Sequence, residues 1–358
     1  MARKSYLIGG MSNYVQSNDP GLFDLEDRLA ELQTLGDPRQ RLDAGVDWAI
    51  FEPVLAQLPQ AQPKGPGGRP AFHPLRMFKA LVLAHLYNRS DAPREFPITD
   101  RYSFQRFLGL RSADSAPDEK PLGAFREPLT RHGLLQPAVD AFGQARATAG
   151  LLARQGQMID APFVEVPRQR NTREENAPRK AGQPPADWAP EPAKARPKDV
   201  AARWAKKGAE RHYGSKNPGK VASQSKRIEA FTVTDAAVHD SAALEALVAP
   251  GDPVTSGDSA YGGPRWEAVF ARHAVEAKGI ERPDRNRPLP ARQQRCNQAK
   301  SRVRGRGEPG FGTIKMSLRA RWHRCIGQGR KAAAITLPNL GYNLVRFEQI
   351  ERLQLRTW

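Results

Sequence analysis

The sequence predicts an α/β protein in which a mixed sheet flanked by helices follows a mostly α-helical N-terminal domain. Apolar residues recur at helical spacing across the first 150 residues, and from residue 158 onward they form short runs typical of strands. Three close strands precede the crossover helices, an order that indicates a mixed sheet. Because 358 residues exceed the usual domain length, we expect two domains, at residues 1–150 and 151–350.

The N-terminal domain contains helical segments separated by prolines and glycines. The segments are residues 22–32, 48–58, 74–87, 102–110 and 123–149. Pro74 suits the first turn of its helix, whereas we expect Pro128 and Pro137 to interrupt the last segment. Residues 59–72 carry four prolines and three glycines, which is typical of a linker.

The second domain begins with a predicted strand at residues 157–166 that carries Asp160 in its middle. An unpaired carboxylate inside a buried strand costs several kcal/mol, so a cation or a hydrogen-bond donor should meet it. One interpretation is a metal site, and the other is an Asp at a strand end that caps a turn.

The rest of this domain contains predicted strands and helices and one long polar segment. We predict strands at residues 212–221, 228–234 and 254–255, a helix at 241–248 capped by Asp240, and a helix at 264–272. Residues 167–210 are rich in Pro and basic side chains and predict a mobile inserted loop. Residues 337–350 indicate an amphipathic closing helix.

Positive charge is concentrated in the C-terminal half. The chain has a formal net charge of +18, and residues 281–358 alone carry 18 Lys and Arg against 5 Asp and Glu. Residues 161–230 form a second basic block, with 16 against 8. Such clustering favours a surface that tracks phosphates over a uniformly solvated protein.

Cysteine content and hydropathy exclude several classes of protein. Cys296 and Cys325 are too few and too far apart for a disulfide framework or a thiolate zinc site. No apolar run reaches the length of a membrane span, and the apolar run near the start is too short for a secretory signal. We therefore expect a bacterial-type cytoplasmic protein that does not enter a membrane.

Two further carboxylates stand out. Asp258 follows a short apolar strand and a glycine, so it should lie at the carboxyl edge of the sheet, where α/β proteins place ligands; alternatively it caps the helix that begins near Pro264. Glu308 is the lone acid among Arg302, Arg304, Arg306 and Lys315, where it either completes a site or balances surface charge. Mg²⁺ prefers carboxylate oxygens, and a pair of such ions serves phosphoryl transfer.

Several short sequence motifs are spread along most of the chain. They lie at residues 67–70 (Gly-Gly-Arg-Pro), 100–110, 125–127, 159–161 (Ile-Asp-Ala), 168–170, 204–207, 212–216 (His-Tyr-Gly-Ser-Lys), 233–240 and 258–261 (Asp-Ser-Ala-Tyr). Together they resemble the DDE transposases of the insertion-sequence 5 family, within the larger insertion-sequence 4-like group.

This resemblance implies a ribonuclease-H-like catalytic fold with Asp160, Asp258 and Glu308 as the catalytic and metal-binding acids. It implies two Mg²⁺ ions, with Mn²⁺ as a substitute, and double-stranded DNA as the partner, both at terminal inverted repeats and at a target. A homodimer in the active complex and association with the nucleoid are expected. The residues expected to bind DNA phosphates are Lys216, Arg302, Arg304, Arg306 and Lys315. The N-terminal domain would recognise DNA ends, mediate dimerisation, or form a packing layer only.

Residues around Glu308 depart from the family pattern. Arg304, Glu308 and Lys315 keep the spacing that the family places on one helix, but Ser301 replaces its tyrosine. Pro309 and several glycines surround Glu308. Inside a helix a proline costs about 3 kcal/mol and a glycine about 1 kcal/mol. Pro162 and Pro218 disturb strands in the same way. A catalytically impaired copy that acts only as a DNA-binding protein is therefore the alternative to an active transposase, and a stand-alone nuclease is a third possibility.

Overall fold

The structure is a computed structural model, and it describes residues 21–59, 71–87, 95–111, 114–148, 156–190, 192–257, 264–279, 289–305 and 308–355. The chain divides into two compact units, residues 1–38 and residues 39–358. In the first unit, helix α1 (Asp24–Thr34) has no buried residue. Helix α2 (Pro38–Gly45) begins at the unit boundary, and the elements after it belong to the second unit.

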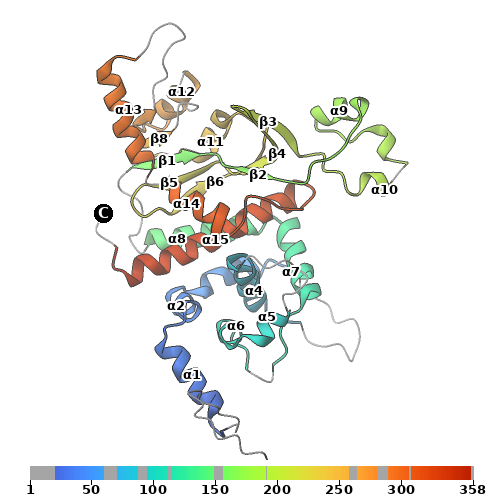
Figure 1. Cartoon of the computed structure of the whole chain (residues 1–358), viewed down its shortest axis with the longest axis vertical. Helices are drawn as coiled ribbons and strands as arrows, with labels where there is room; N and C mark the ends of the chain where they lie inside the picture. The colour runs from blue at the N-terminus through green and yellow to red at the C-terminus, as the bar shows by residue number, and fades with distance from the viewer. Residues whose placement is uncertain are drawn as a thin grey trace, which may run out of the picture. The chain divides into compact units, whose positions relative to one another are not determined.

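The N-terminal part of the second unit is helical, as the sequence predicts. Its elements are η1 (Trp48–Phe51), α3 (Glu52–Leu55), α4 (Pro74–Leu86), α5 (Glu95–Asp100), α6 (Tyr102–Phe107), α7 (Glu119–Arg131) and α8 (Leu135–Thr148) (Figure 1). They share one apolar core around Phe51, Phe78 and Phe107. Pro74 occupies the first turn of α4, and the His73 side chain accepts a hydrogen bond from the Leu75 amide.

The break between α7 and α8 differs from our expectation. Pro128 lies inside α7, and Pro137 lies in the first turn of α8, where a missing amide proton costs no helical hydrogen bond. The helices separate instead at Gly133, whose φ of +65° suits a glycine that ends a helix. The prolines alone therefore gave the wrong position for this break.

A five-stranded mixed sheet forms the centre of the C-terminal part. Its strands are β1 (Gln157–Asp160), β5 (Gly219–Ala222), β6 (Ile228–Phe231), β8 (Thr255–Gly257) and β9 (Ala277–Gly279), in the order β6-β5-β1-β8-β9. Strand β1 pairs antiparallel with β5 and parallel with β8. Strands β5 and β6 are antiparallel, and β8 and β9 are parallel. Strand β1 is thus the middle strand.

Helices cover both faces of this sheet. On one face, Ile159 packs against α11 (Leu244–Leu247) and α12 (Pro264–Arg272), the second of which has the bounds that the sequence predicts. On the other face, Val221 packs against α14 (Glu308–Gly312) and the π-helical turn η5 (Thr313–Ser317). Helix α13 (Ala291–Arg304) contacts β8.

Two of the predicted strands are each split by a proline into strands of different sheets. The predicted strand at residues 157–166 divides at Pro162 into β1 and β2 (Phe163–Glu165). The one at 212–221 divides near Pro218 into β4 (Glu210–Lys216) and β5. Strands β2, β4, β3 (Arg203–Lys207) and β7 (Thr234–Asp235) form the second sheet.

The segment at residues 167–210, which we expected to be a mobile loop, is largely structured. It contains α9 (Arg173–Lys180), η2 (Ala186–Trp188), α10 (Pro192–Ala195) and strand β3. Thr172 and Glu175 form a reciprocal capping box at the start of α9, and Glu175 also accepts a hydrogen bond from the buried Trp188 indole. The Thr172-x-x-Glu175 spacing is a local signal of a helix start, whereas the contact between Glu175 and Trp188 cannot be read from local pattern.

Two smaller expectations are also corrected. The turn η3 (Asp240–Ala243) is capped by His239, whose ring accepts a hydrogen bond from the Ser241 amide, and not by Asp240. The predicted closing helix is longer than expected: α15 spans Gln328–Arg352 and contributes Leu337, Leu340 and Leu344 to the N-terminal helical core. Among the described helices, none is long and apolar enough to cross a membrane.

Candidate active site

Asp160 is the last residue of the central strand β1 and is partly exposed. Its Oδ1 accepts a hydrogen bond from the amide of Ala161 at 2.9 Å. The strand ends here because Pro162 cannot donate to the ladder. The carboxylate therefore stands at the carboxyl end of a strand, where α/β sheets bind ligands, rather than in the middle of a longer strand.

The sheet register fixes which face Asp160 occupies. Successive side chains in a strand point to opposite faces. Ile159 faces α11 and α12, so Asp160 lies on the opposite face, together with Met158. Residues directly opposite in an antiparallel pair share a face, and Asp160 is paired with Gly219. Asp160 thus lies on the face that α14 covers.

Gly219 brings α14 close to this strand end. A Cβ atom on Gly219 would lie 3.0 Å from Cζ of Phe311, so the aromatic ring rests directly on the glycine backbone. Phe311 is buried in α14, and Glu308 lies three residues earlier in the same helix, exposed to solvent. Since residues three apart are neighbours on a helix surface, Glu308 lies beside Phe311 at the start of α14.

The loop after Asp160 is held by buried amides that the sequence did not single out. The backbone N–H of Asn217 donates a hydrogen bond to the Pro162 carbonyl at 2.9 Å. The side chains of Asn217 and Asn339 of α15 donate to each other, at 3.0 and 3.2 Å. Asn343, one turn further along α15, hydrogen-bonds both backbone groups of Ile228 in β6. In the sequence, the signal for these contacts is a pair of asparagines four residues apart in the largely apolar middle of α15, residues 332–345.

The predicted phosphate-binding residues differ in position. Arg302 lies exposed on α13, and Lys315 lies in η5 beside a narrow cavity lined by Pro162, Asn217 and Phe311. Lys216 is buried, with its ammonium 2.7 Å from the Asp240 carboxylate and 2.7 Å from the Val238 carbonyl. The ammonium of Lys216 therefore already has two protein acceptors.

Part of the predicted site lies outside the described residues. This applies to Asp258 and Arg306, and to the side chain of Arg304. The last described residue of β8 is Gly257, which pairs with Ile159. Within the described part of the chain, no three His, Cys, Asp or Glu residues are grouped so that they could hold a metal.

The helix expected around Glu308 is interrupted at Gly305, as the glycines of this segment predict. Helix α13 ends at Arg304, and α14 begins at Glu308. Pro309 occupies the second position of α14, where a proline is tolerated. Lys315 follows in the π-helical turn, so it does not continue a regular α-helix from Glu308.

Comparison with known proteins gives two matches. The family model described as "Transposase DDE domain" matches residues 152–344, which is more than half of the chain. The model described as "Transposase domain (DUF772)" matches residues 27–128. No solved structure matches the chain.

Proposed function

The chain belongs to the transposase DDE domain family, and from this premise we propose that it is the transposase of a bacterial insertion sequence. It binds the terminal inverted repeats of its element and catalyses Mg²⁺-dependent cleavage and transfer of DNA strands. Water hydrolyses a phosphodiester and releases a 3′ hydroxyl. That hydroxyl then attacks a phosphodiester of the target DNA and displaces a 3′ hydroxyl of the target strand, without a covalent protein intermediate. The sheet, with an antiparallel β6-β5-β1 part and a parallel β1-β8-β9 part, supports a ribonuclease-H-like fold.

The observation that carries this proposal is the position of Asp160 at the end of the middle strand. The parallel register pairs Met158 with Ser256 and Ile159 with Gly257. If that register continues by one residue, Asp258 stands directly beside Asp160 on the same face. The Phe311–Gly219 contact supports the approach of Glu308 from α14. Three acids from three separate elements would then meet at one strand end.

These acids suit Mg²⁺, because this ion prefers carboxylate oxygens. Asp160, Asp258 and Glu308 would hold it, and when bound as a pair the ions supply charge for the attacking and leaving oxygens of an in-line displacement. Arg302, Arg304, Arg306 and Lys315 would hold DNA phosphates beside the acids. For Lys216, the ion pair with Asp240 supports a positioning role: it fixes the strand end that precedes Gly219.

A catalytically impaired copy is the second candidate function. The observation that favours it is the gap between the end of α13 at Arg304 and the start of α14 at Glu308. Under this alternative the chain keeps its basic surface and binds DNA, but Glu308 no longer reaches the other two acids.

A nicking assay on supercoiled plasmid with Mg²⁺ separates the two candidates. The active transposase nicks DNA, and Asp160→Asn or Asp258→Asn abolishes nicking while DNA affinity is retained. The matched controls Asp140→Asn, on an exposed position of α8, and Glu267→Gln, on α12, keep full nicking. Absence of nicking with intact DNA binding supports the impaired copy, and nicking that survives Asp160→Asn refutes the proposed site.

A further inference from the structure

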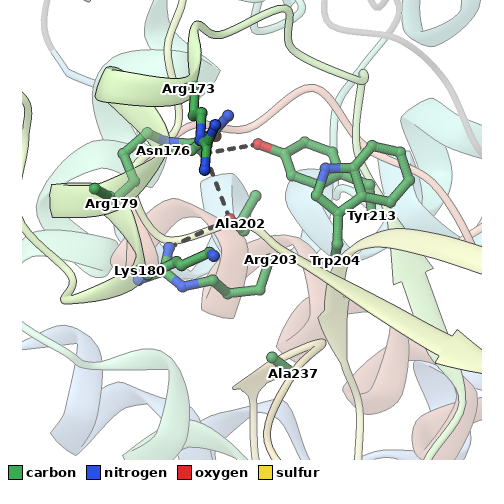
Figure 2. A pocket seen from close by; sticks show the side chains of 10 residues that line it. Arg173, Asn176, Arg179, Lys180, Ala202, Arg203, Trp204, Tyr213 and Ala237 are labelled. Carbon is green, nitrogen blue, oxygen red and sulfur yellow. Dashed lines mark hydrogen bonds between the residues drawn. The ribbon is translucent and has the colours of Figure 1, made fainter.

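A second candidate binding site is formed by α9 and the β3–β4 hairpin. It is a pocket of about 870 Å³ between α9 and strands β3 and β4 (Figure 2). Its lining includes the side chains of Arg173, Arg179, Lys180, Arg203, Trp204 and Tyr213. Four of these side chains are cationic and none is acidic. The pocket therefore presents a concentrated positive charge.

Arg179 is the unusual member of this lining because it is only 5% exposed. One Nη donates to the Tyr213 hydroxyl and the Asp199 carbonyl, both at 2.8 Å, and the other donates to Asn176 Oδ1 at 3.3 Å. Its Nε is buried and has no hydrogen-bond partner. Within the described part of the chain, no carboxylate lies at ion-pair distance from this guanidinium.

A buried cation without a counterion is costly, whereas an anion that meets it removes the penalty. The groups that accept hydrogen bonds from Arg179 are all neutral, so the positive charge of the guanidinium is retained for a ligand in the pocket. Arg173 and Lys180 project from the same helix at exposed positions, where they would meet the same anion.

An aromatic wall accompanies the cations. Trp204 is 48% exposed, and its ring packs against Tyr213 at 4.9 Å between centroids. The Arg168 guanidinium lies 5.5 Å from the centroid of the same indole. Exposed aromatic rings beside clustered cations are the combination with which proteins bind nucleotides along a strand. Beyond Trp204, the exposed Lys206 lies on the same face of β3 and extends the positive surface.

We propose that this pocket is a second DNA-anchoring site, which binds a phosphate of the DNA substrate through Arg173, Arg179 and Lys180 and contacts the attached nucleoside with Trp204. This inference rests on the proposed function, which makes DNA the ligand. The positive surface that continues to Lys206 favours a phosphodiester strand over a free mononucleotide as the physiological ligand.

Thermal melting of the full chain with small probes tests the pocket without any need for catalysis. The probes are thymidine 5′-monophosphate, thymidine and inorganic phosphate. The monophosphate should raise the melting temperature, as a ligand of the native state does, and thymidine should not. The double variant Arg173→Gln/Lys180→Gln should weaken monophosphate binding by at least about tenfold, since two charge-assisted hydrogen bonds are lost. The control Arg131→Gln, on α7, should change nothing.

Further variants separate the parts of the pocket. Trp204→Ala should weaken binding of the monophosphate and leave the affinity for inorganic phosphate unchanged. Arg179→Met should abolish binding of both; if it does not fold, the exposed double variant still decides the matter. Equal melting shifts from thymidine and its monophosphate, or a double variant that binds as tightly as the Arg131→Gln control, would overturn the inference.

Binding to a DNA duplex with a single-stranded end gives the second readout. It is made in an Asp160→Asn background, so that binding is measured without cleavage. The double variant should lower affinity and reduce the salt dependence of binding by about two phosphate contacts. A protein that passes these binding tests but nicks no DNA refutes the proposed catalysis and not the pocket. Normal nicking by a pocket variant with unchanged DNA affinity and salt dependence refutes the pocket and not the catalysis.

Discussion

Substitution of Gly219 by alanine tests whether catalysis requires α14 to pack closely on β5, the strand in which Gly219 is paired with Asp160. The new Cβ would lie 3.0 and 3.1 Å from two ring carbons of Phe311. Carbon atoms normally approach to about 3.5–4.0 Å, so the ring and α14 must move by about 0.5–1 Å. Overpacking of this kind costs about 1–3 kcal/mol of folding stability. A displacement of about 1 Å at a catalytic group can cost about 100-fold in rate.

The assay is plasmid nicking with Mg²⁺, accompanied by urea unfolding of the same preparation. Gly219→Ala should fold, lose about 1–3 kcal/mol and nick far more slowly. The double variant Gly219→Ala/Phe311→Leu makes room for the methyl group and should recover part of the rate. Gly123→Ala is the matched control, because nothing lies within 4 Å of its Cβ position. Wild-type nicking by a folded Gly219→Ala protein would refute the role assigned to α14.

Three other predictions concern stability. Asn339→Ala leaves the buried Asn217 amide without its partner and should cost about 1–3 kcal/mol in urea unfolding; a loss below about 0.5 kcal/mol would contradict the role of this pair. Burial lowers the pKa of His323 from 6.5 to about 4, so its contribution to stability is complete above pH 6.5 and is lost as the pH falls from 6.5 to 4. The wild type should therefore lose about 2 kcal/mol more than His323→Leu between pH 7.5 and pH 5, and equal losses would contradict it. Lys331→Met breaks the buried ion pair with Asp199 (2.7 Å) and should cost about 3–5 kcal/mol in thermal melting, whereas addition of Asp199→Asn should recover part of that loss; a double variant less stable than Lys331→Met would contradict this.

Local pattern predicted the elements whose stability is local. Helix α4 begins at Pro74 and α12 begins at Pro264 as expected, because a proline in the first turn and an apolar stripe mark such helices in the sequence. The break after Arg304 was also predicted from the glycines that follow it, whereas Pro309, which we expected to disturb the helix, lies in the first turn of α14. These signals depend only on residues within one or two turns.

Elements that depend on distant partners were not predicted. The sequence indicated that Pro162 and Pro218 disturb strands. Only the pairing of β1 with β5 and of β2 with β4 shows that the chain passes from one sheet into the other at each of these prolines. Gly214 allows β4 to lie close to β2 in the second sheet, because a Cβ there would lie 2.3 Å from the Val164 carbonyl oxygen. The order in residues 167–210 likewise depends on contacts such as Lys331 with Asp199, which join residues 132 positions apart.

Of the candidate site, the sequence supplied the acids but not their supports. Asp160 and Glu308 were identified as candidate residues from their residue type and surroundings. The contact of Phe311 with Gly219 and the amide pair of Asn217 with Asn339 became visible only in three dimensions. Both join elements far apart in the chain, so neither leaves a periodic signal.

A disulfide between positions 160 and 258 tests the meeting of the acids most directly. Neighbouring strands lie about 4.8 Å apart, and a disulfide needs Cα atoms about 4.4–6.8 Å apart. In a chain whose Cys296 and Cys325 are replaced by serine, Asp160→Cys/Asp258→Cys should form a disulfide rapidly on mild oxidation. Asp160→Cys/Gly257→Cys, in which the second thiol belongs to the opposite face, should not. A cysteine pair at 160 and 258 that stays reduced, in a folded protein, would contradict a shared site for these two carboxylates.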